Sequence, residues 1–276
     1  YLKHLTVRTP FQTLSAPLQL LAAWPRRLSL PELREVKNEP KLLAAASRLL
    51  LLPQSNTLDV GREVGTELAL FVSLAREGQH VAFEPEPQKA RRLRRKFPAV
   101  DVRETALLSD TLLRELALED SSLEPAHEAL DVLSAMRGEG RSLDDLIPED
   151  HSVDLLRLRF AGAELFVMMG AERLLQRCRP SLVFGSQLAL LTQWELRPED
   201  VFDYLSGLGY RVFLPRAFVA GGSALLRAEF TEAHAYPVLA CNFIATAPER
   251  VCGRRLVQRS ARHSERIPLA GQANVA

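Results

Sequence analysis

Two glycines and two acidic residues lie where two apolar runs of this chain end. Residues 57–60 form the first run, which carries Asp59 and leads into Gly61 and Gly65; the second run ends at Glu84. Because glycine lacks a Cβ, such a turn adopts unusual backbone angles and lets a ligand approach the N–H groups of a following helix. A carboxylate after the second strand can accept hydrogen bonds from both hydroxyls of a ribose. The pattern predicts a site for an adenosine-containing cofactor, with a bare packing turn as the alternative.

These residues need a scaffold that brings the two runs side by side. From residue 56 onward, runs of strand length alternate with helical patterns, which is typical of a parallel sheet covered by helices on both faces. Further strands are expected at 100–108, 153–160, 181–184, 210–214 and 238–246, the last two as an antiparallel pair. Helices are expected at 86–97 and 163–176, and between Pro198 and Gly209. The segment 111–140 indicates a helix, a loop and a second helix.

Six motifs, in order, carry a resemblance to a known family. They are LDVGREVG, VAFEPEP, ETALLSD, RSLDDLI, VDLLRLRFAGAELFVMMGAERLL and RPSLVF, and they extend over about residues 58–214. This series resembles the FkbM-type family of S-adenosylmethionine-dependent methyltransferases. The resemblance implies a Rossmann-like α/β fold with S-adenosylmethionine as cofactor. It assigns the cofactor-binding residues to Asp59, Gly61, Gly65, Glu84, Ala106 and Asp110.

The chain departs from the family where the methyl acceptor would bind. Family members commonly read close to KIDVEGAE at the fourth strand, and this chain reads RLRFAGAE, which places Arg159 and Ala161 at two acidic positions. Of these acids only Glu164 is kept, and an acid common after the next strand is Gly185 here. Methyl transfer usually needs a base that removes the acceptor proton. The resemblance therefore implies a degenerate active site in which Glu164 is the candidate catalytic residue.

Two hypotheses of function follow. In the first, catalysis has decayed and the protein is a structural or RNA-contacting subunit of a larger assembly, such as a mitochondrial or ribosomal one. The alternative is an active O-methyltransferase acting on a small-molecule or sugar hydroxyl, with Glu164, His151 or a residue of 111–140 as base. S-adenosylmethionine binding is expected in the second case, and its loss is compatible with the first.

The chain divides into three regions. Prolines cut residues 1–55 into short helical pieces, which predict a helical extension; residues 56–247 form the methyltransferase-like domain. Residues 248–276 form a basic tail with no apolar period, and such a tail needs a partner to become ordered. The predicted partner is another protein subunit or RNA, and packing on its own domain is the alternative. RNA contact is assigned to Arg254, Arg255, Arg259 and Arg262.

Composition bears on nucleic-acid binding, metal sites, membrane spans and cellular location. A net charge of +1 gives no global field toward nucleic acid, although the arginines of the 86–97 helix could contact phosphates; a solvated helix face is the favoured interpretation there. The three cysteines lack metal or disulfide spacing, so no metal site is predicted and a reducing compartment is expected. The longest apolar run, 42–53, is shorter than the roughly 20 residues of a membrane span. Because the sequence starts at Tyr1, a mitochondrial or other organellar matrix is the expected location, with the cytoplasm as the alternative.

Overall fold

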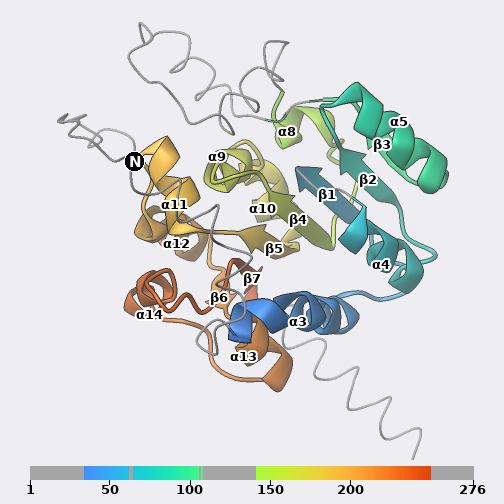
Figure 1. Ribbon diagram of the computed structural model, residues 1–276. Coiled ribbons are helices and arrows are strands. Elements are labelled where there is room, and N and C mark those ends of the chain that lie inside the picture. Colours follow the sequence, from blue (N-terminus) through green and yellow to red (C-terminus); the bar gives the residue numbers. More distant parts are fainter. Residues whose placement is uncertain (1–33, 62–64, 106, 108–140, 250–276) are drawn as a thin grey trace, which may run out of the picture.

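The computed structural model describes residues 34–61, 65–105, 107 and 141–249 (Figure 1). Within them lies a seven-stranded sheet in the order β3-β2-β1-β4-β5-β7-β6. Neighbours from β3 to β5 run parallel, and β7 runs antiparallel to both β5 and β6. The strands are β1 (Thr57–Gly61), β2 (His80–Phe83), β3 (Asp101–Arg103), β4 (Leu155–Arg159), β5 (Ser181–Gly185), β6 (Arg211–Phe213) and β7 (Asn242–Thr246). The mostly parallel α/β sheet and its antiparallel closing pair are confirmed.

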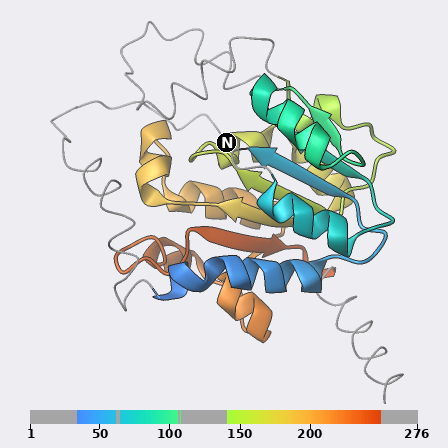
Figure 2. The same ribbon diagram turned by 45° about the vertical axis from the view of Figure 1, so that its right-hand side comes forward.

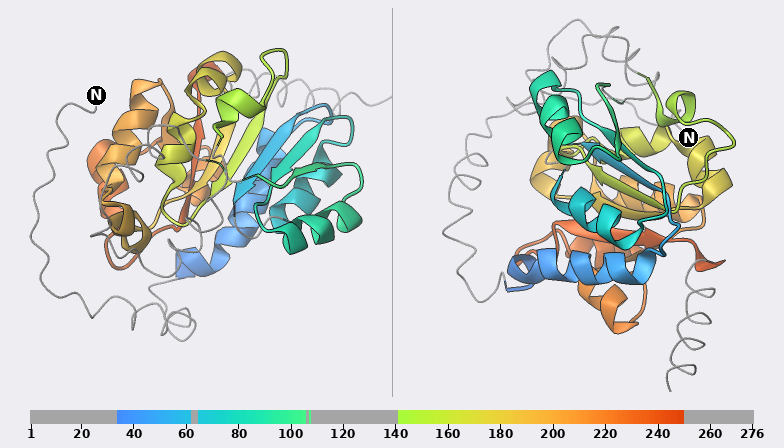
Figure 3. Two further views of the ribbon diagram at one scale, coloured as in Figure 1. Left: turned by 90° about the horizontal axis from the view of Figure 1, so that it is seen from above. Right: turned by 90° about the vertical axis from the view of Figure 1, so that its right-hand side faces the viewer.

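Helices cover both faces of this sheet (Figure 3). One face is covered by α3 (Arg34–Leu50), α4 (Thr66–Leu74), α5 (Pro87–Lys96) and α13 (Pro215–Ala220). The other is covered by α8 (Leu143–Leu146), α9 (Glu164–Met169), α10 (Glu172–Cys178), α11 (Leu188–Leu191), η3 (Thr192–Trp194), α12 (Pro198–Gly207) and α14 (Arg227–Glu232). The sheet is therefore the middle of three layers, with an apolar core on each side.

Strand alternation decides which side chain enters which core. In β4, Leu156 and Leu158 join the core under α9 and α12, whereas Leu155 joins the core under α3. Successive strand residues point to opposite faces, so Arg157 and Arg159 point toward the α3 and α4 side. Two positive charges are thus aimed at one helical layer.

Helix α3 lies along the sheet and packs against α13, as Figure 2 shows. Short helical pieces cut by prolines were expected within residues 1–55, whereas α3 runs unbroken from Arg34 to Leu50 with Pro40 inside it. The boundary drawn at residue 55 stays a prediction, although α3 contributes Leu43, Ala46 and Leu50 to a core shared with the sheet. No helix within the described residues is long and apolar enough to cross a membrane.

Several elements differ from the sequence prediction. The expected helix 163–176 is two helices, because α9 ends at Met169 and α10 begins at Glu172, with Gly170 and Ala171 between them. The third strand is only Asp101–Arg103, the edge strand of the sheet, with Leu107 pairing separately to Arg141. Helices α13 and α14 form between β6 and β7, where no element was predicted. The helices expected in 111–140 lie outside the described residues.

Candidate cofactor site

The predicted cofactor residues at the ends of β1 and β2 lie at one edge of the sheet. Val60 pairs with Phe83, and Gly61 pairs with Arg159 on the other side. Gly61 consequently stands between the end of β4 and Glu84, which directly follows β2. Gly65 is the N-cap of α4 and follows residues 62–64, which are outside the described ranges. Parallel strands present their carboxyl ends at the same edge, and ligands of open α/β sheets bind there.

Only glycine fits at the end of β1. The backbone of Gly61 has φ +114°, and a Cβ there would lie 2.0 Å from the carbonyl oxygen of Arg159. That distance is a hard clash with backbone, so the close approach of β4 already requires this glycine. The glycine therefore serves packing as well as any approach of a ligand.

Glu84 is held in a defined orientation after β2. Its backbone N–H donates to the carbonyl oxygen of Arg103 at 3.0 Å, and its Oε1 accepts from the N–H of Glu86 at 3.0 Å. The side chain is buried at the sheet edge. A fixed carboxylate next to Gly61 is the arrangement predicted for ribose recognition.

Asp59 is placed differently from the other predicted residues. Its carboxylate is fully buried, and Oδ1 accepts from Nη1 of Arg157 at 2.7 Å. Arg157 also reaches Glu67 of α4 at 3.2 Å. Alternation in β1 could have shown this, because Leu58 and Val60 point to the opposite core. The structure thus gives Asp59 a contact that ties β1 to β4, and a direct cofactor contact stays a prediction.

Glu164 turns back onto the turn that follows β4. Its Oε1 accepts from the N–H of Phe160 at 2.7 Å, and the side chain is nearly fully buried. Oε2 is also buried and has no hydrogen-bond partner among the described residues. Burial raises the pKa of Glu164 to about 7, against the opposing effect of backbone N–H groups.

Arg159 lies among acidic side chains at this edge. Burial raises the pKa of both Glu39 and Glu164, and the positive charge of Arg159 partly offsets that rise in each. The charge of Arg159 therefore has two carboxylic acids within electrostatic reach. A Cβ at Gly185 would lie 4.0 Å from Cγ of Arg159, so the end of β5 borders the same space.

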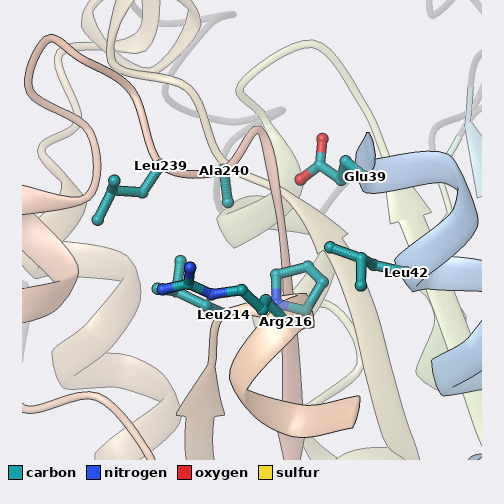
Figure 4. Close-up of a pocket in the computed structure, with 7 residues that line it drawn as sticks. Glu39, Leu42, Leu214, Arg216, Leu239 and Ala240 are labelled. Atoms are coloured by element: carbon teal, nitrogen blue, oxygen red, sulfur yellow. The ribbon is translucent and has the colours of Figure 1, made fainter. Parts of the chain in front are cut away.

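A pocket next to this edge is lined by residues of three segments (Figure 4). Its lining residues are Glu39, Leu42, Leu214, Pro215, Arg216, Leu239 and Ala240. Glu39 Oε1 accepts from the N–H groups of Cys241 (3.0 Å) and Asn242 (2.7 Å), which fixes the start of β7 to α3. Sequence reasoning missed Glu39 because it belongs to no motif and its partners are some 200 residues away in the chain.

The remaining predicted residues are elsewhere. His151, considered as a base, precedes the amino end of β4 and so lies at the opposite edge of the sheet from Glu164. Ala106 and Asp110 lie outside the described residues, as do Arg254, Arg255, Arg259 and Arg262. Within the described ranges, no three His, Cys, Asp or Glu side chains gather as a metal site.

Comparison with known proteins agrees with this geometry. Residues 59–212 match the model of the methyltransferase FkbM domain, which is more than half of the chain. The chain belongs to the FkbM methyltransferase family. Its sheet, with β7 inserted antiparallel between β5 and β6, is accordingly a Rossmann-like methyltransferase sheet. None of the curated proteins compared with this FkbM chain matches it.

Several solved methyltransferases resemble this FkbM-family chain. Methyltransferase FkbM from Methylobacillus flagellatus is 15% identical over 71% of this chain and 44% of its own, with a TM-score of 0.43. The plantazolicin methyltransferase BpumL, solved with a triazolic desmethylPZN analog and SAH, is 10% identical over 83% of this chain and 88% of its own (TM-score 0.42). Precorrin-6y C5,15-methyltransferase from Geobacter metallireducens is 19% identical over 62% and 72% (TM-score 0.38). The chain thus spans less than half the length of the Methylobacillus protein.

Proposed function

We propose that this FkbM-family protein has lost methyl transfer and acts as a structural or RNA-contacting subunit of a larger assembly. The carrying observation is the state of Glu164, the one acid kept at the acceptor end. Its Oε1 is bonded to the N–H of Phe160 and the whole carboxyl is buried, so it stabilises its own turn. A base must reach the proton that it abstracts, and this carboxyl faces protein instead.

The surrounding residues support the same proposal. Arg159 and Ala161 stand at positions where family members commonly carry acids, and Gly185 offers no side chain. His151, the other candidate base within the described residues, lies at the far edge of the sheet. An organellar location, including a mitochondrial one, stays a prediction.

The residues at the β1 and β2 ends still fit an S-adenosylmethionine molecule. Glu84 would hold the ribose hydroxyls, and Gly61 and Gly65 would leave the backbone open to the rest of the cofactor. The bound cofactor would supply a transferable methyl group. The cofactor-binding residues are retained, but no exposed base lies beside them among the residues that the structure describes. This combination supports a methyltransferase fold that has kept its structure and lost methyl transfer.

The alternative, an active O-methyltransferase on a small-molecule or sugar hydroxyl, is favoured by one observation. Burial raises the pKa of Glu164 to about 7, and a general base works best with a pKa near the operating pH. A movement of the 160–164 turn that exposes this carboxyl would make it a competent base.

Calorimetric titration of the whole chain with S-adenosylmethionine and S-adenosylhomocysteine tests the proposal. Glu84, Gly61 and Gly65 are kept, but the positive charge of Arg159 opposes a sulfonium at this edge. We therefore expect no heat of S-adenosylmethionine binding at concentrations up to about 1 mM from protein that circular dichroism shows to be folded. Micromolar binding of both ligands would contradict this expectation and support the active O-methyltransferase. In that case Glu84→Ala should abolish binding, because it removes the predicted ribose contact.

A second titration uses the variant Arg159→Asp/Ala161→Glu, which restores the two acids. It removes a positive charge near the predicted sulfonium and adds two negative ones, so cofactor binding should strengthen at least tenfold. Arg159→Gln/Ala161→Gln is the matched control without the new charges. Equal affinity of the two variants for S-adenosylmethionine would contradict the claim that acids at positions 159 and 161 strengthen cofactor binding.

A further inference from the structure

Helix α5 carries six basic side chains and no acidic one. They are Lys89, Arg91, Arg92, Arg94, Arg95 and Lys96. All six are exposed. The helix lies at the β3 end of the sheet, where it covers the edge strand (Figure 1).

Three of these side chains already have partners. Lys89 pairs with Glu86 at 2.6 Å, Arg94 pairs with Glu104, and Lys96 lies over the ring of Phe97. The other three form the exposed arginine face of α5, which is Arg91, Arg92 and Arg95. Within the described part of the chain, this face makes no ion pair or side-chain hydrogen bond.

Helix stability does not account for the arginine face. Basic residues in the last turn of a helix are favoured by its dipole, but Arg91 and Arg92 precede that turn. Like charges four residues apart, as in Arg91 and Arg95, destabilise an isolated helix by roughly 0.2–0.5 kcal/mol. An uncompensated cluster of this kind fits a polyanion that neutralises it.

The burial of α5 decides which kind of polyanion. Its apolar residues Ala90 and Leu93 are buried against the sheet, and none of the exposed large hydrophobic residues lies on this helix. A helix that enters a membrane surface needs an exposed apolar face beside its charges. The exposed face of α5 carries positive charge and no large apolar side chain. This face therefore favours binding to the phosphate backbone of a nucleic acid over binding to a lipid surface.

We propose that the arginine face of α5 binds the backbone of single-stranded RNA. The inference rests on the RNA-contacting form of the proposed function. Arginine forms bidentate hydrogen bonds with phosphate, and its planar group stacks on unpaired bases, which single-stranded RNA offers. Helix α5 would act in addition to the arginines of residues 250–276.

Fluorescence anisotropy of a labelled 20-nucleotide RNA of mixed sequence tests the surface, using the whole chain. The variant Arg91→Gln/Arg92→Gln/Arg95→Gln should bind roughly 10- to 100-fold more weakly at about 0.1 M salt. The slope of log affinity against log salt should fall by about 2, since each single-strand phosphate contact contributes about 0.7. Glutamine is a good helix former, so thermal unfolding should be little changed.

The matched control is Lys37→Gln/Lys41→Gln/Arg48→Gln on α3. These three side chains are also exposed and their loss changes the net charge equally, so affinity should fall less than threefold. Equal weakening by both variants would overturn the α5 surface while leaving RNA contact by the protein intact. Tighter binding to phosphatidylserine vesicles or to duplex DNA than to RNA would also overturn it.

Failure of the proposed function has a separate signature. If the unaltered chain binds no RNA, both the α5 surface and the RNA-contacting role are overturned. The cofactor titration is independent of that result and still decides whether the chain binds S-adenosylmethionine.

Discussion

The carboxylate of Glu164 occupies the space in which a side chain at Gly185 would begin. A Cβ at residue 185 would lie 2.9 Å from Oε1 of Glu164, closer than Cβ atoms approach other heavy atoms. Glu164 is the first residue of α9, shortly after β4, and Gly185 is the last residue of β5. The carboxyl ends of β4 and β5 therefore border the same space. With Glu164 in this position, an acid at residue 185 cannot be accommodated.

This contact predicts energetic coupling between the two positions. Gly185→Ala should lower the free energy of unfolding by about 1–2 kcal/mol through overpacking. Glu164→Ala should cost about 1–3 kcal/mol, because the buried N–H of Phe160 loses its acceptor. The double variant should be about 1 kcal/mol more stable than the sum of the two costs predicts, measured by urea denaturation.

Gly207→Ala is the control for the added methyl group. Nothing lies within 4 Å of a Cβ there, and Gly207 is the last residue of α12. Its substitution should leave stability unchanged or slightly raise it. Strict additivity of Gly185→Ala and Glu164→Ala would show that the two groups do not compete for space.

The buried Glu164 also predicts a pH dependence of stability. Burial raises the pKa in the folded state to about 7 from an ordinary value of 4.5. Between those values the folded protein holds a proton that the unfolded chain releases, so stability falls as pH rises through this window. The loss attributable to Glu164 is about 3 kcal/mol between pH 4 and pH 8.

Comparison with Glu164→Gln isolates this effect. The amide oxygen can still accept from Phe160 and carries no charge, so the variant should gain stability relative to the wild type as pH rises. Urea denaturation at pH 5, 6, 7 and 8 measures the difference. Glu77→Gln, at an exposed position, is the control and should track the wild type. Parallel curves for Glu164→Gln and the wild type would rule out a buried titrating carboxyl.

Local patterns predicted the scaffold because they depend on neighbours in sequence. Alternation of strand and helix runs was enough for a parallel sheet, and Glu84 followed its strand as expected. In the structure, Gly61, Glu84 and Glu164 lie at one edge of the sheet. The break between α9 and α10 was missed because Met168, Met169 and Leu175 continue one helical pattern across Gly170.

The contacts that define the site could not be predicted in this way. Asp59 pairs with Arg157, 98 positions away, and Glu39 binds the backbone of Cys241, 202 positions away. Patterns of helix or strand periodicity cover only neighbouring residues, so they cannot predict contacts over such separations. Such non-local contacts gave Asp59 a structural partner, and they gave Glu39, which belongs to no motif, a structural role.

The Asp59–Arg157 ion pair predicts a large asymmetry between its single and double variants. Both side chains are almost fully buried, at 0% and 3% exposure. Arg157→Met leaves the Asp59 carboxylate without its cation and should cost about 3–5 kcal/mol. Asp59→Leu/Arg157→Met replaces both charges with apolar groups and should be close to the wild type in urea denaturation.

The third member of this network provides the control. Glu67 approaches Arg157 at 3.2 Å but is 22% exposed, so water compensates part of its loss. Glu67→Gln should therefore cost less than about 1 kcal/mol. If Asp59→Leu/Arg157→Met were as unstable as Arg157→Met, the ion pair itself would stabilise the fold. The cost of Arg157→Met would then not come from leaving the Asp59 carboxylate unpaired.

The turn after β4 stores backbone strain at Ala161. This residue has φ +53°, a left-handed conformation that costs a residue with a Cβ about 1–2 kcal/mol. Ala161→Gly should raise the free energy of unfolding by roughly 0.5–1 kcal/mol, after the larger entropy of the unfolded glycine is counted. The bond from Nε1 of Trp194 to the carbonyl oxygen of Ala161 is made by backbone and is retained.

Ala163→Gly is the matched control in the same turn. Ala163 has φ −87° and is fully buried, so glycine relieves no strain there and should cost about 1 kcal/mol. Opposite signs for the two variants in urea denaturation would locate the strain at Ala161. Equal losses would show that the turn is relaxed. The strain at Ala161 also bears on Glu164. A strained turn releases its strain energy when it opens, so it would expose the Glu164 carboxyl more readily than a relaxed turn would.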